Sequence, residues 1–374
     1  MPTEKKDSLN KNEKDIILYV GAIPTYVKEI VKKHNANWQV YLLKNIYKKS
    51  EDDVDMEIDK ILYVDFKKTH KLSEVLLPYL ENIKVVTTAS DFGINYFKKI
   101  VAHLPYLRTP TKESLVWSTN KYEMRKRFEI FCPEHTPKFT VVKNQNPEER
   151  NRIIEKIGFP LIIKPADLAS SLLVSICYHE EELEQVLRKT YTKIKKQYKD
   201  NQRLQEPIIL AEEFMDGDMY SVDAYVDSRG HVTCCPLVRV LRGTDIGDDD
   251  FYNYAHITPS GLRSTSEQKA YTVAEKAIHA LALRSTTAHV ELLKIDNEWK
   301  IIEIGARMGG FRHVIYDLAF DINHALNDIL VRIPKRPVVT KQKHEHAVAL
   351  KWFAKEEGVI QEMKGIKKIE QLKS

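Results

Sequence analysis

The sequence predicts an α/β protein with a parallel sheet in its N-terminal part and antiparallel sheet structure further along the chain. Between residues 15 and 104, short apolar runs alternate with helical periodicity, which is typical of a parallel sheet covered by helices. The apolar–polar alternation over 208–214 and 220–226 suits antiparallel pairing instead. A hairpin pattern occupies 288–304.

The N-terminal part is expected to contain strands separated by helices. The predicted strands cover 16–20, 39–43, 61–64 and 85–88, and the predicted helices cover 26–34, 72–82 and 93–103. The polar insert 48–56 is expected to be an exposed loop. We therefore expect an α/β domain over 15–117, preceded by a flexible segment over 1–14.

A second unit is predicted to begin near Ser118. Thr119 and Asn120 offer capping side chains for a helix that runs through Arg127. The next predicted elements are strand 139–142, helix 147–157, strands 159–164 and 172–177, and helix 180–196. These elements predict a smaller subdomain over 118–207.

The remaining residues are expected to form a larger subdomain over 208–346 and a β-rich appendage over 347–374. Helices are predicted at 266–283 and 311–331, on either side of the hairpin.

The composition excludes some classes of protein. A content of 43% hydrophobic and 30% charged residues is typical of globular proteins rather than disordered or membrane proteins. No apolar stretch reaches the ~18 residues that a membrane span needs, and the polar N-terminus does not resemble a signal peptide. A membrane is therefore not an expected partner. The net charge of +5 comes without a basic block interleaved with aromatic residues, so nucleic acid is not an expected partner either.

The cysteines fit a reducing, cytoplasmic environment. Cys132, Cys177, Cys234 and Cys235 form no CxxC pair and no zinc-like spacing with histidine. We interpret the neighbouring Cys234 and Cys235 as buried structural thiols, because they lie within an apolar run.

Two glutamates occupy facing positions of the predicted hairpin. If the loop contains three residues, 296–298, Glu291 lies opposite Glu303 on one face of the sheet. Opposed carboxylates repel unless a cation lies between them, and rigidly held oxygen ligands suit Mg²⁺. The alternative is that both glutamates point into solvent. The surrounding isoleucines and leucines argue against a solvent-exposed face, because they are apolar.

A loop of small residues, 305–310, follows the hairpin and carries one arginine, Arg307. Gly309 and Gly310 would let the backbone approach a ligand closely, and Arg307 can clamp anionic oxygen atoms. These three residues are therefore candidates for substrate binding. The alternative is an ordinary strand-to-helix turn with an arginine at the surface.

Five segments together resemble the ATP-grasp enzymes, in that family's order and with family-like spacing. They are 120–125, 162–167, 211–217, 289–291 and 303–310. The resemblance covers nearly the whole chain and implies an ATP-grasp fold: an N-terminal Rossmann-like parallel α/β domain, a central lid subdomain and a C-terminal domain with an antiparallel sheet. The stretch Glu-Ile-Gly-Ala-Arg at 303–307 is most similar to L-amino-acid ligases and related dipeptide-forming enzymes.

The resemblance implies that ATP is bound by three of these segments. Lys121 and Lys164 would contact the phosphates. Glu212 would accept a hydrogen bond from the adenine amino group. The backbone groups that would read the edge of the adenine ring belong to Glu213, Phe214 and Met215.

The resemblance also implies the chemistry. Glu291 and Glu303 would hold Mg²⁺ or Mn²⁺ while a substrate carboxylate attacks the γ-phosphorus of ATP, with Lys164 as a catalytic cation. An amine would then attack the acyl phosphate, and Arg307 would stabilise the oxyanion. The implied partners are small-molecule carboxylates and amines, such as amino acids or peptides. Homodimers are common among similar enzymes.

The chain departs from the family pattern around the nucleotide. The loop 167–173, which is normally glycine-rich, contains no glycine here, so the hydroxyl groups of Ser170 and Ser171 become the candidate phosphate donors. Met219 stands where an acid that binds ribose is expected. Asp218, one position earlier, is the candidate replacement.

Candidates for substrate recognition lie in the stretch 238–259, between predicted sheet elements. Arg242 can hold a carboxylate, and the acidic cluster 248–250 can hold an amine. His256 is a further candidate. Two alternatives stay open: a solvated loop of mixed charge, and a packed histidine at 256.

Two other functions remain as alternatives. Purine-pathway ligases and biotin-dependent carboxylases share the fold, but they more often keep an asparagine metal ligand where this chain has Gly305. A regulator that binds ATP without turnover would fit the altered phosphate loop. The retained lysines, glutamates and Arg307 argue against it.

Overall fold

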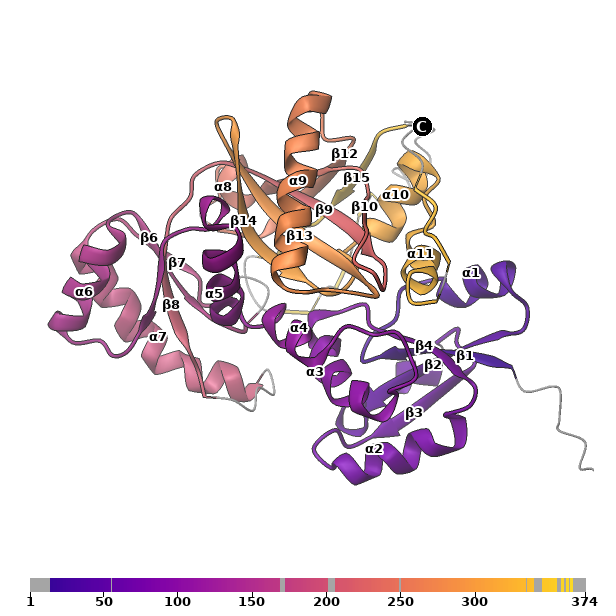
Figure 1. Ribbon diagram of the computed structural model, residues 1–374. Helices are drawn as coiled ribbons and strands as arrows, with labels where there is room; N and C mark the ends of the chain where they lie inside the picture. The colour runs from indigo at the N-terminus through magenta and orange to yellow at the C-terminus, as the bar shows by residue number, and fades with distance from the viewer. Residues whose placement is uncertain are drawn as a thin grey trace, which may run out of the picture.

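The computed structural model describes residues 14–54, 56–168, 172–200, 206–248, 250–333, 335–339, 345–354, 358–359, 361–362 and 364–365. The described residues form three sheets, one parallel and two antiparallel, with helices packed on their faces (Figure 1). The α/β class and the change from parallel to antiparallel pairing are confirmed. None of the described helices has the length and apolar character needed to cross a bilayer.

The parallel sheet has the strand order β3-β2-β1-β4. Its strands are β1 (Asp15–Val20), β2 (Trp38–Asn45), β3 (Lys60–Val64) and β4 (Ile83–Thr87), and its helices are α1 (Val27–His34), α2 (Thr69–Leu76) and α3 (Asp91–Ile100). Alternate β1 residues separate the two faces: Ile17 packs with α1, whereas Leu18 packs with α2 and α3. The sequence therefore forms a sheet that is covered on both sides.

The insert between β2 and β3 is less open than expected. It contains two short 3₁₀ turns, Ile46–Lys48 and Glu51–Val54. Asp53 is buried there, where it pairs with Lys44 and accepts a hydrogen bond from the Tyr63 hydroxyl at 2.7 Å. These contacts explain why a segment with an acidic sequence folds back onto the domain.

The smaller antiparallel sheet has the order β5-β8-β6-β7. Its strands are β5 (Phe139–Val142), β6 (Leu161–Pro165), β7 (Ser175–Cys177) and β8 (Ile209–Glu213). Helices α6 (Pro147–Ile157) and α7 (Glu180–Asp200) pack on it through a hydrophobic core of their own (Figure 1). The helix α5 (Lys121–Phe131) precedes this sheet and, as predicted, begins at the Asn120 side chain, which accepts from two backbone N–H groups.

The larger antiparallel sheet has the order β14-β13-β9-β11-β12-β15, with β10 paired to β9. Its strands are β9 (Asp218–Val226), β10 (Val232–Cys234), β11 (Val238–Arg242), β12 (Asn253–Thr258), β13 (Thr286–Ile295), β14 (Glu298–Gly305) and β15 (Ala347–Leu350). Two expectations are corrected here. The stretch 238–259 contributes two strands and the short helix α8 (Gly243–Ile246), and 347–350 joins the sheet rather than a separate appendage.

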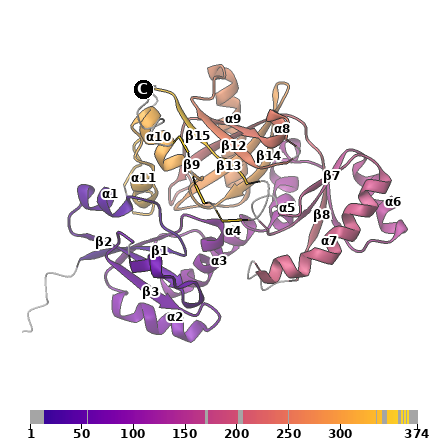
Figure 2. The same cartoon turned by 180° about the vertical axis from the view of Figure 1, so that it is seen from behind.

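The helix predicted over 311–331 is wrong as a single element. The chain forms α10 (Arg312–Phe320) and α11 (His324–Leu330) instead. Asp321 has a left-handed backbone with φ of 54°, which ends α10 because a helix cannot continue through that conformation. The break lets α11 pack against α1 of the parallel sheet, beside which it lies in both views (Figure 1 and Figure 2).

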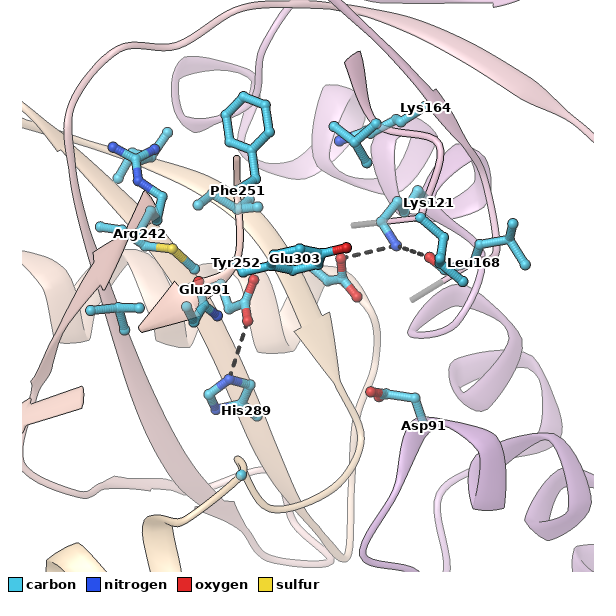
Figure 3. Close-up of a pocket in the computed structure, with 18 of the residues that line it drawn as sticks. Asp91, Lys121, Lys164, Leu168, Arg242, Phe251, Tyr252, His289, Glu291 and Glu303 are labelled. Atoms are coloured by element: carbon cyan, nitrogen blue, oxygen red, sulfur yellow. Dashed lines mark hydrogen bonds and ion pairs between the residues drawn. The ribbon is translucent and has the colours of Figure 1, made fainter. Parts of the chain in front are cut away.

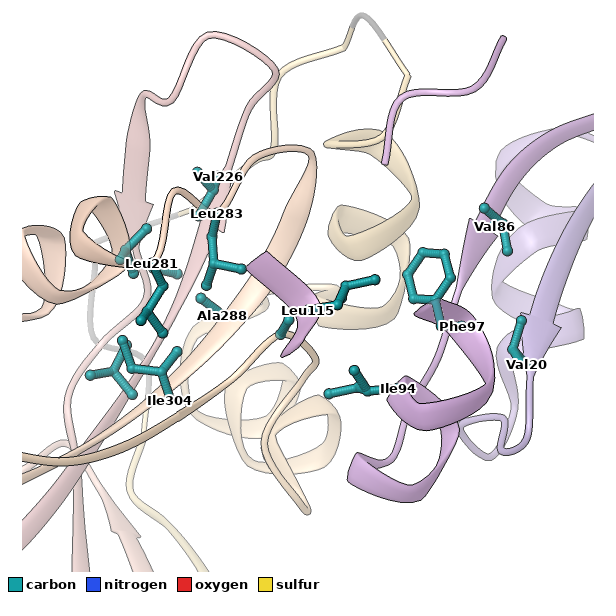
Figure 4. Close-up of a cluster of buried hydrophobic side chains, with 14 of the residues drawn as sticks. Val20, Val86, Ile94, Phe97, Leu115, Val226, Leu281, Leu283, Ala288 and Ile304 are labelled. Atoms are coloured by element: carbon teal, nitrogen blue, oxygen red, sulfur yellow. The ribbon is translucent and has the colours of Figure 1, made fainter. Parts of the chain in front are cut away.

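One hydrophobic core joins the parallel sheet to the larger antiparallel sheet. Its members include Val20 and Phe97 on one side and Ala288 and Ile304 on the other, with Leu115 between them (Figure 4). Leu115 belongs to α4 (Lys112–Trp117) and is fully buried. The helix α9 (Ser264–Ala280) packs on the same core. This shared core fixes the start of α3 beside the end of β14.

Candidate functional site

A cavity of about 520 Å³ is lined by residues of both antiparallel sheets and by residues 89–91 at the start of α3, which packs on the parallel sheet (Figure 3). Most of the residues selected from the sequence line it: Lys121, Lys164, Glu212, Glu213, Phe214, Met215, Arg242, His256, Glu291, Glu303, Arg307 and Gly310. The structure therefore brings together residues that are up to 189 positions apart in the chain, Lys121 and Gly310.

Two selected residues are not among those that line this cavity. Asp218 is exposed and lies 3.6 Å from Arg239, whereas its neighbour Met219 points into the cavity, because successive strand residues face opposite sides. Gly309 lies behind His289 rather than at the cavity surface. Ser170 and Ser171 fall outside the described residues.

Lys121, the first residue of α5, bridges two parts of the site. Its ammonium group lies 3.0 Å from a carboxylate oxygen of Glu303 and donates to the Leu168 carbonyl at 3.0 Å (Figure 3). Its backbone N–H donates to the Ala166 carbonyl at 2.6 Å. The helix start is thus fixed against the segment after β6, with its cation facing the β14 carboxylate.

Glu212 is the centre of a buried ion-pair network. Arg125 donates to both of its carboxylate oxygens, at 3.1 and 3.0 Å, and Lys164 lies 2.7 Å from one of them. Burial would raise the pKa of Glu212, but Arg125 and Lys164 lower it below its usual value. Both oxygens are thus already engaged by cations, which differs from the predicted role as a free acceptor for adenine.

The same network holds β14 in place. Arg125 also donates to the Ile302 carbonyl at 2.8 Å, so one guanidinium ties α5, β8 and β14 together. Lys164 is 8% exposed, and burial lowers its pKa to about 8, although Glu212 opposes that shift. Sequence reasoning did not select Arg125. The sequence did offer one indication: Arg125 is a long cationic side chain one helical turn after Lys121, so the two lie on the same face of the helix.

Glu291 and Glu303 lie opposite each other, as predicted, but the hairpin has a different turn and a bulge. The turn holds two residues, Asp296 and Asn297, rather than three. A bulge at Ile302 adds one residue to β14 and restores the facing pair. The bulge also turns the Ile302 carbonyl toward Arg125.

The two glutamates fit a hard cation. Their side chains are 23% and 28% exposed, and both line the cavity. Burial would raise the pKa of Glu291, but His289 and Arg307 hold it below the usual value, so the carboxylate is ionised. Within the described ranges, no group of three or more acidic, histidine or cysteine side chains could hold a metal by itself. Mg²⁺ suits this donor set because it takes its other ligands from phosphate and water.

Arg307 is held by a residue from the parallel sheet domain. Asp91, the first residue of α3, forms a two-pronged ion pair with its guanidinium, with one Nε–Oδ1 distance of 2.7 Å. Gly305 permits this approach, because a Cβ there would lie 3.2 Å from Asp91 Oδ1. Sequence reasoning missed Asp91, since nothing local marks a partner 216 positions away.

Asp223 is a second residue that sequence reasoning missed. Its buried carboxylate accepts from His289 at 2.6 Å, from His324 at 2.8 Å and from the Gly309 backbone N–H at 2.7 Å. The other ring nitrogen of His289 lies 3.5 Å from Glu291. Asp223 thus connects the glycine loop to the β13 glutamate. The signal was a charged residue in the middle of the largely apolar stretch 219–226 of β9.

Gly309→Ala is expected to lower the thermal unfolding midpoint. A Cβ at Gly309 would lie 2.5 Å from His289 Nδ1 and 2.7 Å from Arg312 Cγ. Overpacking of this kind costs about 1–3 kcal/mol. Gly310→Ala is the matched control, because its Cβ would meet no atom of the described residues within 4 Å. Circular dichroism melts of both variants test this, and equal shifts would contradict the packing argument.

Comparison with known protein families identifies this arrangement. Residues 157–314 match the model of the ATP-grasp domain. The chain contains an ATP-grasp domain. The matched segment includes Lys164, Glu212, Glu291, Glu303 and Arg307.

The ATP-grasp domain is also the region of similarity to known enzymes. The alanine–anticapsin ligase of Bacillus subtilis (strain 168) is 29% identical over 177 residues, which make up 45% of this chain and 37% of that ligase. The match therefore spans well under half the length of this relative.

Solved structures resemble nearly the whole chain. The L-amino acid ligase from Bacillus licheniformis has a TM-score of 0.74 at 18% identity, with 97% of this chain and 86% of that chain covered. Phosphoribosylglycinamide synthetase from Anaerococcus prevotii has a TM-score of 0.66 at 20% identity, with 93% and 84% covered. At these identities the likeness concerns the fold alone, and the chain has the ATP-grasp fold.

Proposed function

We propose that the chain is an ATP- and Mg²⁺-dependent carboxylate–amine ligase, which forms an amide or peptide bond through an acyl phosphate and releases ADP and phosphate. The proposal rests on the convergence of two lysines, two opposed glutamates and an arginine on one cavity: Lys121, Lys164, Glu291, Glu303 and Arg307. A protein that only binds nucleotide has little need of two metal-binding carboxylates.

The lysines and glutamates would serve phosphoryl transfer. Such transfer depends mainly on positioning and on neutralising phosphate charge, which Lys121 and Lys164 can do. Lys121 would exchange its ion pair with Glu303 for a phosphate oxygen, which frees that carboxylate. Glu291 and Glu303 would hold Mg²⁺, which when bound supplies Lewis-acid stabilisation of the phosphate oxygens.

Arg307 would act in the second step. The nitrogen of the amine forms a bond to the carbonyl carbon of the acyl phosphate, and the carbonyl oxygen becomes an oxyanion. The nitrogen then loses a proton to solvent, the C–O bond to phosphate breaks, and phosphate leaves as the amide forms. A guanidinium donates hydrogen bonds to such an oxyanion. Asp91 would hold the arginine in position between turnovers. Amino acids are the proposed substrates, which agrees with the names of the ligases that the domain resembles.

The test is release of ADP and phosphate from ATP and Mg²⁺, with the twenty amino acids offered singly and in pairs. We expect release that depends on amino acids and falls at least about 100-fold in Glu303→Gln, since even outer contacts of a metal site contribute about 10- to 100-fold. Glu298→Gln is the matched control, an exposed glutamate on the same strand. Nucleotide binding without any turnover would favour a regulator, and AMP with pyrophosphate would exclude the acyl phosphate route.

Nucleotide affinity is expected to fall as the pH rises through about 8. Burial lowers the pKa of Lys164 to about 8, so the free protein loses this cation above that pH. Below it, the ammonium group is already charged and affinity should level off. Calorimetric titration with ADP above pH 7, where the phosphates are ionised, measures the effect. Lys164→Met should bind weakly at every pH, and a decline that persists in this variant would assign the titration to another group.

A further inference from the structure

The two outer strands of the larger antiparallel sheet, β14 and β15, differ in how their free edges are covered. On β14, the Trp299 carbonyl accepts a hydrogen bond from His135 Nδ1 at 2.9 Å. The Ile302 carbonyl of the same strand accepts from Arg125 at 2.8 Å. On the other side of the sheet, β15 pairs with β12, and no strand of the described residues pairs with its outer edge.

The outer edge of β15 is apolar. Lys351 donates its backbone N–H to the Tyr254 carbonyl at 2.8 Å, so the residues that alternate with it turn their backbone groups away from β12. These residues are Val348, Leu350 and Trp352, and they are 53%, 54% and 79% exposed. Strand edges that stay uncovered normally carry charged residues or proline, and these three positions carry neither.

Helix α10 extends this apolar surface along the strand. Near one end of β15, the Glu345 backbone N–H donates to the Ala319 carbonyl at 3.3 Å. Near the other end, the Lys351 ammonium lies 5.1 Å from the centre of the Phe311 ring. The helix therefore runs antiparallel to β15, and the two lie side by side in both views (Figure 1 and Figure 2). The exposed apolar residues of α10 and its N-cap are Phe311 at 42%, Val314 at 41% and Leu318 at 62%.

The β15 edge is complementary to a second copy of itself. In an antiparallel pair about a two-fold axis at Leu350, each Leu350 would face the other, and Val348 of each copy would face Trp352 of the other. All three residues turn their N–H and carbonyl groups outward, so donors and acceptors would match across the axis. A shift by one residue would instead oppose outward groups with groups that already bond to β12.

The surface is also of the size that a specific dimer needs. Covering the six exposed side chains would bury on the order of 600 Å² per copy, since a half-exposed large apolar side chain presents about 100 Å². A specific interface of standard size buries about 800 Å² per partner, and the paired backbones would add to the side-chain area. Because the β14 edge is already covered, pairing at β15 would join two copies rather than a growing row.

We propose that two copies of this chain associate through β15, in antiparallel pairing about a two-fold axis at Leu350, with α10 of each copy beside the joined strands. The chain continues from β15 into Lys351 and Phe353, which line the cavity. Each copy would therefore fix the strand that holds part of the cavity wall of the other. The inference goes beyond the proposed ligase function and does not depend on it, because it concerns the edge of the sheet.

Sedimentation velocity of the whole chain over a range of concentrations tests the dimer. Leu350→Lys would place two ammonium groups opposite each other on the axis, so we expect the dissociation constant of the dimer to rise at least about 100-fold. Leu77→Lys is the matched control, because Leu77 is 68% exposed and lies in the turn after α2, in the parallel-sheet domain. This variant should sediment like the wild type.

Leu350→Cys tests the register by a second route. The Cα atoms of directly opposed, hydrogen-bonded residues on antiparallel strands are about 5.5 Å apart, within the range of about 4.4–6.8 Å that disulfides span. Oxidised glutathione should therefore link two copies of this variant covalently, as seen on a non-reducing gel. Leu77→Cys and the wild type, whose own cysteines are free thiols, should not be linked. Circular dichroism melts check that the variants fold.

Three results would overturn the proposal. A wild-type dimer that Leu350→Lys leaves intact, with no cross-link in Leu350→Cys, would place the interface elsewhere. A monomeric wild type in which the amide hydrogens of Val348, Leu350 and Trp352 exchange rapidly would show that the edge stays open. A monomer in which these amides are protected from exchange would show that another segment of the same chain covers the edge.

Discussion

Arg307→Met is expected to lower the rate of amino-acid-dependent ADP release by about 100- to 1,000-fold, which is the usual effect of removing one donor to an oxyanion. The methionine side chain preserves much of the apolar stem but donates no hydrogen bond. The loss should appear in kcat more than in KM, because the oxyanion exists only in the transition state and the intermediate. Steady-state kinetics with saturating ATP measure it.

The ion pair with Asp91 requires a second variant. Arg307→Met leaves the Asp91 carboxylate without its two-pronged partner, so part of its effect could come from local rearrangement. Asp91→Asn keeps the guanidinium but weakens its anchor. We expect a smaller loss in Asp91→Asn than in Arg307→Met. If both variants lose the same activity, the arginine acts by positioning the α3 domain rather than by contact with the substrate.

Asp223→Asn is expected to lower the free energy of unfolding by about 3–5 kcal/mol, because breaking a buried ion-pair network leaves uncompensated charge. Asp223 is fully buried, and its partners include His289, His324 and the Gly309 N–H. An asparagine keeps the shape but removes the negative charge that the histidines face. Urea denaturation followed by circular dichroism measures the change.

Asp218→Asn is the matched control for this prediction. Asp218 lies on the same strand, and its side chain is 56% exposed and lies 3.6 Å from Arg239. Exposed pairs of this kind contribute about 0–1 kcal/mol. Similar denaturation midpoints for the two variants would mean that the buried network adds nothing beyond a surface contact.

The residues near one another in sequence were the most predictable. The facing of Glu291 and Glu303 follows from the hairpin pattern, even though the structure reaches it with a shorter turn and a bulge at Ile302. Asn120 was recognisable as a helix cap for a similar reason. The hairpin pairing and the helix cap both depend on residues close together in sequence, so the local spacing of residue types is enough to predict them.

The partners of the site residues were not predictable in this way. Arg307 meets Asp91, and Glu212 meets Arg125, across sequence separations that local patterns do not record. The end of α10 at Asp321 was also missed, because apolar spacing does not record the left-handed backbone that ends the helix there. The domain boundaries and the roles of the site residues stay predictions.

The smaller antiparallel sheet has its own hydrophobic core, separate from the one that joins the other two sheets. We therefore expect the smaller sheet to open more readily than the rest of the described fold. Amide hydrogens of β5–β8 are expected to exchange with solvent faster than those of β9 and β13. A nucleotide held between Lys164 on one unit and Glu303 on the other would bridge them, and its binding energy would slow that exchange.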